Sequence, residues 1–229
     1  IIMFNKILCL VRKNDDYSKK LVRYLKKRSK KLVIFNSSKV NEKIKSKIFQ
    51  VPNNHYDYIF SFRSYFILKK QHLKKAKISS INFHPAPPNY RGFGGINFAL
   101  YNGEKKWGVT THLMSEKLDS GKIVDYKSFN IGKYDNLDTL LKKTHTVLLF
   151  QSKKVIQLLN KDKKNLSKLI KKNKKFKWSK KIYSKKELEL FYEINLNDSK
   201  EKIYQKINAT VTPKFKPFIK YKNKKFYLG

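Results

Sequence analysis

Short apolar runs alternate with stretches of helical periodicity over the first 84 residues, and this alternation restricts the possible folds more than any other feature. Four runs have the length of buried strands: 7–11, 32–35, 58–62 and 78–83. Helices are expected in the intervals between them, at about 15–25, 41–49 and 64–74. The order predicts the first half of a Rossmann-like α/β fold, with a mostly parallel twisted sheet flanked by helices.

The segment from residue 85 to residue 95 interrupts this alternation. Within eleven residues it contains three prolines and three glycines: Pro85, Pro87, Pro88, Gly92, Gly94 and Gly95. Such a composition excludes a helix and a central strand, so we expect a rigid irregular loop at the carboxyl end of the fourth strand. Ligands of open α/β sheets bind at that edge, which makes the loop a candidate part of a binding site.

The rest of the chain completes the domain and adds a small C-terminal part. A short helix, two strands and a long helix are expected at 95–101, 109–114, 122–129 and 137–159. A lysine-dense stretch at 161–181 is typical of a solvated linker or a charged helix face, with a phosphate-binding strip as the alternative. Ser184 and Ser199 are expected to start helices, and 213–228 has the pattern of a β-hairpin that turns at 222–224. We therefore expect three parts: an α/β domain over 1–160, a Lys-rich linker over 161–183 and a small C-terminal subdomain over 184–229.

Lysine dominates the composition. The chain has 54 Lys and Arg residues against 16 Asp and Glu residues, which gives a formal net charge of +38. Clustered basic residues bind the phosphates of nucleic acids or of anionic membranes, so both kinds of partner have to be considered. The lysines are spread from Lys6 to Lys225, which favours a generally basic surface over a single binding patch. A surface of this kind steers anionic small molecules toward any cleft.

Other features of the composition bear on location. Hydrophobic residues make up 40% of the chain and aromatic residues 14%, enough to build a core. The longest apolar runs fall far short of the roughly 20 residues that a membrane-spanning helix needs. The single cysteine, Cys9, cannot form an intramolecular disulfide, and no secretion-signal pattern opens the sequence. We expect a cytoplasmic globular protein without membrane insertion.

Three polar residues lie at the edges of expected strands. Asn82 and His84 end the fourth strand, and Asp119 lies in the loop before the strand at 122–129. Residues i and i+2 of a strand point to the same side, so Asn82 and His84 are expected to face one pocket. An amide N–H stabilises a carbonyl oxygen that gains negative charge, an imidazole moves a proton, and a carboxylate orients the imidazole. For each residue taken singly, a structural role is the alternative.

Three motifs surround these residues: Ile81-Asn82-Phe83-His84-Pro85-Ala86-Pro87-Pro88-Asn89-Tyr90-Arg91-Gly92, Gly108-Val109-Thr110-Thr111-His112 and Leu118-Asp119-Ser120-Gly121-Lys122-Ile123. Together they resemble the formyltransferase family that uses 10-formyltetrahydrofolate. The resemblance implies a Rossmann-like catalytic domain and an enzyme that transfers a formyl group directly, without a covalent enzyme intermediate. It also implies that Asn82, His84 and Asp119 form the catalytic triad.

The resemblance extends to binding residues. For the folate donor it implies contacts with Phe62, Arg63, Ser64, Tyr65, Leu118 and Gly121. For the acceptor it implies contacts with Pro87, Tyr90, Arg91 and Gly92. Packing of the loop is the alternative role of Tyr90 and Arg91, and His112 either is structural or lines the cleft. The five histidines and Cys9 show no metal-ligand spacing, so we expect no metal cofactor.

Departures from the family pattern bear on the acceptor. Pro85-Ala86-Pro87-Pro88 stands where enzymes that formylate methionyl-tRNA place a Ser-Leu-Leu-Pro-like stretch, and the short C-terminal part leaves little room for the barrel of those enzymes. Both features resemble the sugar N-formyltransferases, which formylate the amine of a nucleotide-linked amino sugar, a precursor of cell-surface polysaccharide. Asn208-Ala209 replaces the family's usual Arg-Ala, which puts a role of that arginine in doubt.

Alternative functions remain at this point. Methionyl-tRNA and glycinamide ribonucleotide are alternative acceptors, and the basic charge favours the tRNA. A protein of another class, a basic nucleic-acid-binding protein on an inactive formyltransferase fold, is a further alternative, although nothing in packing requires the three polar residues together. A homodimer is also compatible with the sequence, because the C-terminal hairpin offers an edge that can pair with another subunit.

Overall fold

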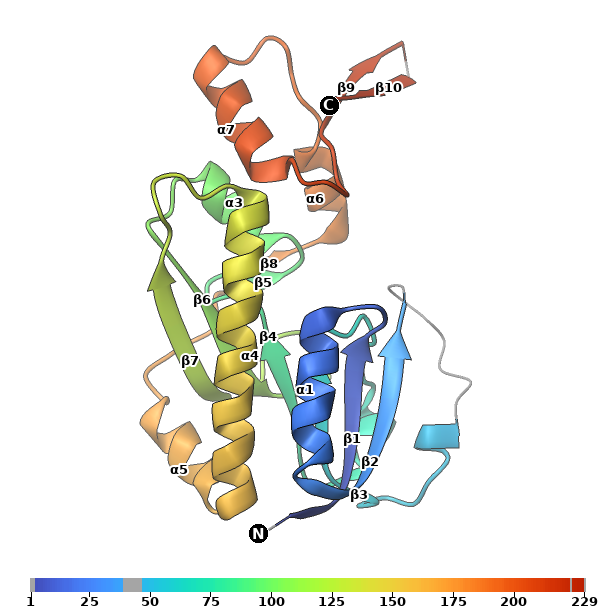
Figure 1. The fold of residues 1–229 in the computed structure, drawn as a ribbon. Coiled ribbons are helices and arrows are strands. Elements are labelled where there is room, and N and C mark those ends of the chain that lie inside the picture. The colour runs from blue at the N-terminus through green and yellow to red at the C-terminus, as the bar shows by residue number, and fades with distance from the viewer. Residues whose placement is uncertain (1–2, 39–46, 223, 229) are drawn as a thin grey trace. The chain divides into compact units, whose positions relative to one another are not determined.

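The computed structural model describes residues 3–38, 47–222 and 224–228 (Figure 1). Its main sheet has six strands in the order β2-β1-β3-β4-β6-β7. Their bounds are β1 Phe4–Arg12, β2 Ser29–Ser37, β3 Tyr56–Phe62, β4 Ala76–His84, β6 Lys106–Leu113 and β7 Ile123–Asn130. From β2 to β4 all neighbours pair in parallel, and β6 pairs with β4 in the antiparallel direction. The mostly parallel α/β sheet expected from the sequence is confirmed.

Helices alternate with these strands and continue beyond them along the chain. Their bounds are α1 Asp16–Lys26, α2 Lys70–Leu73, α3 Gly95–Tyr101, α4 Leu137–Lys161, α5 Asn165–Lys172, α6 Lys185–Phe191 and α7 Lys200–Thr210, with a 3₁₀ turn η1 at Lys47–Phe49. Residues near the start of α1 determine where the helix begins, because the side chain of the N-cap Asp15 accepts a hydrogen bond from Ser18 N at 2.8 Å. Tyr24 of α1 donates to Lys153 O of α4 at 3.1 Å, so these two helices lie side by side (Figure 1).

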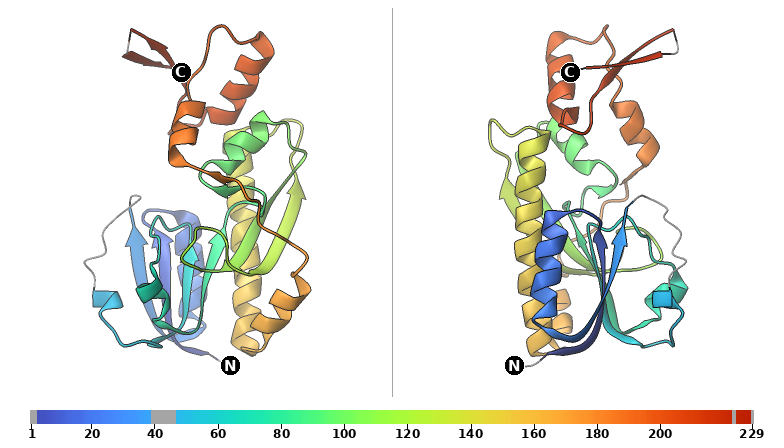
Figure 2. Two further views of the ribbon diagram at one scale, coloured as in Figure 1. Left: turned by 180° about the vertical axis from the view of Figure 1, so that it is seen from behind. Right: turned by 45° about the vertical axis from the view of Figure 1, so that its right-hand side comes forward.

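The described chain divides into two compact units. The first consists of the described residues within 1–85, 109–127 and 145–177, and the second of those within 86–108, 128–144 and 178–229. In the first unit, an apolar cluster around Leu8, Leu10 and Ile59 packs against Phe49 of η1 and Leu73 of α2. The right-hand view of Figure 2 shows η1 on the opposite side of the strands from α1. Both faces of the parallel strands are therefore covered, as their continuous apolar runs require.

The second unit is built around aromatic contacts. β5 Arg91–Gly92 pairs with β8 Ile182–Tyr183, and Phe98 of α3 stacks on Tyr183 with ring centroids 4.5 Å apart. Asn97 Nδ2 donates to Ala209 O at 2.7 Å and so joins α3 to α7. At the C-terminus, β9 Phe218–Tyr221 and β10 Lys224–Tyr227 form the antiparallel hairpin that the sequence predicts.

The loop after β3 differs from the sequence prediction. A helix over 64–74 is wrong for most of that range, because α2 has only the four residues Lys70–Leu73. Ser64 Oγ lies 3.0 Å from Ser37 Oγ, and Tyr65 N donates to the same Ser37 hydroxyl at 2.9 Å. These contacts tie the first residues of the loop to β2 and compete with a helical turn.

The remaining sequence predictions have different outcomes. Most of the helix predicted at 41–49 lies outside the described residues, and 47–49 form η1; Asn223 of the predicted hairpin turn also lies outside them. The lysine-dense stretch contains α5, whose lysines are exposed. The division into 1–160, 161–183 and 184–229 stays a prediction. Within the described ranges, no helix is both long enough and apolar enough to cross a membrane.

Candidate active site

The pairing of β4 with β6 gathers polar side chains on one face of the sheet. In the antiparallel register, Asn82 lies opposite His112 and His84 lies opposite Thr110. Alternate residues of a strand share a face, and residues directly opposite on neighbouring strands share it too. Asn82, His84 and His112 therefore project from the same face.

A tight loop before β7 brings Asp119 to this face. Asp119 has a φ angle of 43°, in the left-handed region that aspartate adopts more readily than most residues. A Cβ atom on Gly121 would lie 1.8 Å from Leu113 O, so this close approach of loop and strand requires glycine. Ser120 Oγ donates to Lys117 O at 2.8 Å and closes the loop on itself.

The four side chains form one cluster. His84 Nδ1 lies 3.6 Å from Asp119 Oδ2, and His112 Nε2 lies 3.4 Å from Asp119 Oδ1. Asn82 Nδ2 lies 3.1 Å from the same His112 Nε2. The Asp119 side chain is only 4% exposed, and each histidine side chain is below 10%. The two oxygens of one buried carboxylate therefore lie close to two imidazoles. Electrostatic interactions in such buried surroundings are stronger than in water.

This cluster holds the groups that acyl chemistry uses. The half-buried Asn82 amide can donate to an oxygen that becomes negatively charged. The imidazole of His84 can accept a proton, and the nearby Asp119 carboxylate stabilises the resulting cation. The structure thus brings together the three residues that the sequence singles out, while their catalytic role stays a prediction.

His112 is the member of the cluster that the sequence leaves undecided. Its place follows from the antiparallel register of β4 and β6, which sets His112 directly across from Asn82. The only sequence signal for this contact is the alternating pattern of the strand at 109–114, and it does not reveal the partner strand. The sequence therefore could not identify His112 as a neighbour of both Asn82 and Asp119.

Four of the residues expected to contact folate lie at the end of β3 and in the turn after it: Phe62 ends the strand, and Arg63, Ser64 and Tyr65 follow. Arg63 has a φ angle of 54°, and its side chain is 7% exposed. Its Nη2 pairs with Asp15 Oδ1 at 3.0 Å. Burial lowers the pKa of Arg63 to about 10, so the guanidinium stays cationic at neutral pH. Its buried Nε and Nη1 atoms have no hydrogen-bond partner within the described part of the chain.

The expected acceptor-binding residues lie in the second unit: Pro87, Tyr90, Arg91 and Gly92. Tyr90 Oη donates to Glu104 Oε1 at 2.9 Å, and Arg91 Nη1 donates to Ser179 O at 2.9 Å. Gly92 has a φ angle of 86°, which favours glycine. These contacts attach the loop to Glu104 and Ser179 and give Tyr90 and Arg91 a packing role, while a contact with the acceptor stays a prediction.

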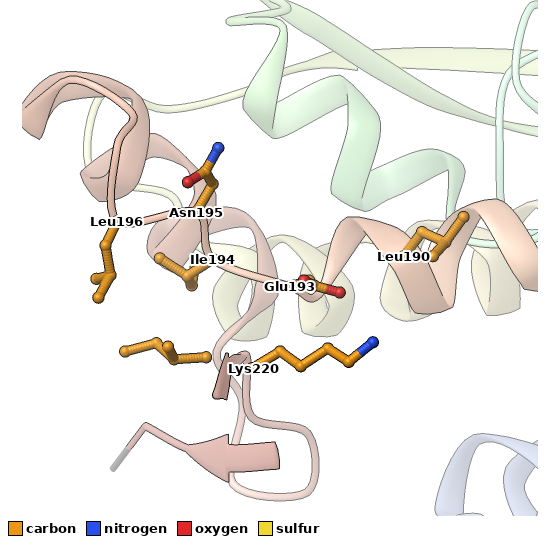
Figure 3. Close-up of a pocket in the computed structure, with 7 residues that line it drawn as sticks. Leu190, Glu193, Ile194, Asn195, Leu196 and Lys220 are labelled. Atoms are coloured by element: carbon orange, nitrogen blue, oxygen red, sulfur yellow. The ribbon is translucent and has the colours of Figure 1, made fainter. Parts of the chain in front are cut away.

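A pocket of about 540 Å³ lies elsewhere in the second unit (Figure 3). Its lining consists of Leu190, Glu193, Ile194, Asn195, Leu196, Ile219 and Lys220. None of these residues belongs to the expected site, and the lining lacks the imidazole and carboxylate pairing of the cluster. Over the described ranges, no group of three or more His, Cys, Asp or Glu residues is arranged to hold a metal ion.

Comparison with known proteins assigns the chain to a family. The family described as formyl transferase matches residues 5–149, which is more than half of the chain. This protein therefore belongs to the formyl transferase family. The matched range includes β4, β6 and the loop that carries Asp119.

Two relatives show the range of proteins that carry similar sequences. The bifunctional polymyxin resistance protein ArnA of Wigglesworthia glossinidia brevipalpis is 38% identical over 110 residues, which covers 48% of this chain and 17% of that protein. The methionyl-tRNA formyltransferase of Thermodesulfovibrio yellowstonii is 44% identical over 82 residues, which covers 35% of this chain and 27% of that enzyme. The matched regions thus span only about a quarter or less of either relative.

Solved structures share the fold over nearly the whole chain. A sugar N-formyltransferase from a Shewanella species superimposes with a TM-score of 0.69 at 17% identity, covering 98% of this chain and 96% of that one. An N-formyltransferase from Helicobacter canadensis, in complex with folinic acid and dTDP-3-aminofucose, gives a TM-score of 0.66 at 18% identity and covers 96% and 86%. At such low identity these likenesses establish the fold.

Proposed function

We propose that this protein is an N-formyltransferase that moves the formyl group of 10-formyltetrahydrofolate to the amine of a nucleotide-linked amino sugar. The observation that carries the proposal is the cluster of Asn82, His84 and Asp119, in which an amide, an imidazole and a carboxylate meet on one face of the sheet. Membership of the formyl transferase family supports the reaction type.

The sugar acceptor has separate support. The Shewanella and Helicobacter canadensis enzymes match this chain over 86% or more of their own lengths, and the second binds dTDP-3-aminofucose. The matches to the ArnA protein and the methionyl-tRNA formyltransferase, in contrast, cover small parts of those proteins. The proline-rich stretch at 85–88 points in the same direction. We therefore favour a nucleotide sugar, an anionic substrate that a basic surface attracts.

Each residue of the cluster has a separate role in the formyl transfer. The reaction forms a bond between the acceptor amine and the formyl carbon and breaks the bond from that carbon to N10 of the folate. Asn82 donates an N–H to the formyl oxygen as negative charge develops on it. His84 takes a proton from the amine and returns it toward N10, and Asp119 stabilises the protonated ring. Because Nδ1 is the nitrogen beside Asp119, we assign the proton transfer to Nε2 of His84.

The turn after β3 and the Asp119 loop suit a folate. Arg63 places a cationic guanidinium at this turn, and the carboxylate oxygens of a folate are anionic. Leu118 and Gly121 flank Asp119 in the loop that Gly121 packs against β6. Together with Phe62, Ser64 and Tyr65, these residues would hold the donor next to the cluster.

Methionyl-tRNA is a second candidate acceptor. The 44% identity to a methionyl-tRNA formyltransferase over 82 residues favours it, and so does the net charge of +38. A tRNA acceptor predicts a steep loss of binding with salt, because each phosphate contact releases counterions.

The test is release of tetrahydrofolate from 10-formyltetrahydrofolate. Nucleotide-linked 3-amino and 4-amino deoxysugars, methionyl-tRNA and glycinamide ribonucleotide are offered separately. We expect acceptor-dependent release with one sugar nucleotide. Asn82→Ala should lower kcat by about 10²- to 10³-fold, since it removes a donor to the developing oxyanion. His84→Ala should abolish most of the turnover, since it removes the group that moves the proton.

The control is His72→Ala, which removes a histidine of α2 that lies outside the cluster. It should keep wild-type turnover. Release with methionyl-tRNA alone would overturn the sugar acceptor but keep the reaction type. Wild-type turnover in both cluster variants would overturn the proposed site.

A further inference from the structure

The backbone fixes which nitrogen of His112 carries the proton. His112 Nδ1 lies 2.8 Å from Leu113 O. A carbonyl oxygen only accepts hydrogen bonds, so Nδ1 is the donor and is protonated. In the neutral ring Nε2 is then an acceptor, and its neighbour at 3.1 Å is the amide nitrogen of Asn82. The Leu113 carbonyl thus selects the tautomer that accepts an N–H from Asn82.

We propose that His112 is a positioning residue, which holds the Asn82 amide with its nitrogen toward the cluster. One N–H of that amide bonds to His112 Nε2, and the second is kept for the oxygen of the formyl group. In the reversed amide, the Asn82 oxygen would face the lone pair of the buried Nε2, and two acceptors in contact leave both atoms without a hydrogen bond there. The role in catalysis rests on the proposed function, whereas the tautomer follows from the contacts alone.

The hydrogen bond from Asn82 to His112 requires a neutral His112 ring, and Asp119 is the group that would favour a second proton on that ring. Its Oδ1 lies 3.4 Å from His112 Nε2, so a proton on Nε2 would create a charge-assisted hydrogen bond to the carboxylate. Nε2 cannot accept while it donates, so that proton would release the Asn82 amide. The other oxygen of Asp119 lies beside His84 Nδ1. The proposed arrangement therefore requires that the transferred proton be taken up by His84 and that none be added at Nε2 of His112.

The first test is spectroscopic and needs no activity. Two-bond ¹H–¹⁵N spectra of the ¹⁵N-histidine-labelled protein separate the two neutral tautomers and the imidazolium. The His112 signals are assigned by their loss in His112→Gln. We expect the neutral Nδ1–H tautomer at pH 7. An Nε2–H tautomer or an imidazolium at that pH would overturn the proposal.

The second test compares two substitutions at the same position. The glutamine of His112→Gln presents an amide oxygen that can accept from Asn82, whereas the leucine of His112→Leu presents no acceptor. His112→Leu should lower kcat by about 10- to 100-fold, as expected for a displaced catalytic group, with KM for donor and acceptor changed less than about threefold. His112→Gln should recover most of that loss. Equal kcat losses in the two variants, or a loss confined to KM, would contradict a positioning role.

A matched control lies on the same strand. Thr111 points to the opposite face of β6, where its hydroxyl donates to Gln151 Oε1 at 3.0 Å. Thr111→Val perturbs the buried strand without touching the cluster and should leave kcat near the wild-type value. Absence of transfer by the wild-type protein would end the proposed function but leave the tautomer measurement intact, so the two failures are distinguishable.

Discussion

Gly121 determines the position of Asp119, because it has no side chain. The space where its Cβ would lie is occupied by the backbone oxygen of Leu113, at 1.8 Å. The backbone of Leu113 is held at the same contact, because its N–H donates to Lys122 O at 2.9 Å. The loop can therefore bring Asp119 to the cluster only while residue 121 is glycine.

Gly121→Ala should separate the loop from β6 and move Asp119 away from both histidines. A displacement of about 1 Å can cost about 10²-fold in rate, so we expect kcat to fall by at least that factor while the circular dichroism spectrum is kept. Gly103→Ala is the matched control, because Gly103 has a φ angle of 66° but nothing lies within 4 Å of its would-be Cβ. A kcat near the wild-type value in Gly121→Ala would show that the loop does not set the site.

At the level of elements, the contact between α1 and α4 half-buries an ionisable ring. His145 of α4 packs edge-on against Tyr17 of α1, with ring centroids 5.5 Å apart. Burial lowers the pKa of His145 to about 2, and the positive charges of Arg63 and Arg12 act in the same direction. The folded protein therefore keeps this imidazole neutral over the whole range in which an unfolded histidine gains a proton.

This contact predicts a stability that falls as the pH is lowered. Between about pH 6.5, the ordinary pKa of histidine, and about pH 2, the unfolded chain binds one more proton at His145 than the folded chain does. The free energy of unfolding should therefore fall by up to about 1.4 kcal/mol per pH unit below pH 6.5 from this group. Urea titrations at pH 7, 6, 5 and 4 measure this free energy of unfolding. His145→Gln is the comparison, because it lacks the titrating ring and should show a weaker pH dependence. A variant with the same pH dependence as the wild type would contradict the assignment.

Local patterns explain which elements the sequence could predict. The start of α1 depends on Asp15 and Ser18, three residues apart, and the strands depend on their own apolar runs. The loop at 64–69 depends instead on a hydroxyl of β2, Ser37, which no pattern near Ser64 reveals. The same limit holds at the site. The pairing of Asn82 with His84 is a property of one strand, whereas the place of His112 requires the antiparallel register of two.

The charge of the whole molecule is a property that no single contact carries. At a net charge of +38, repulsion among the lysines opposes the compact state. Several ion pairs in the described residues are exposed, such as Lys19 with Asp16 and Lys185 with Glu189, and such pairs contribute little. Screening of the repulsion should therefore outweigh screening of the attractions.

Added salt should accordingly stabilise the protein. We expect Tm to rise as the NaCl concentration increases from about 20 to about 300 mM, because the Debye length shortens and the lysines repel each other less. A gain of about 1 kcal/mol would raise Tm by about 2–4 °C in a chain of this size. Differential scanning calorimetry measures the shift, and sucrose at equal osmolarity is the control for solute exclusion. A fall in Tm with NaCl would mean that attractive ion pairs dominate.

The buried cysteine of β1 makes the unfolding of the protein measurable at one atom. Cys9 is the only cysteine of the chain, is fully buried, and has a pKa that burial raises to about 12. The thiolate is the reactive form, so a maleimide can label this side chain only after the strand opens to solvent. Because β1 lies between β2 and β3, such an opening disrupts the centre of the parallel sheet. The labelling rate of a single sulfur thus reports how often the parallel sheet opens at β1.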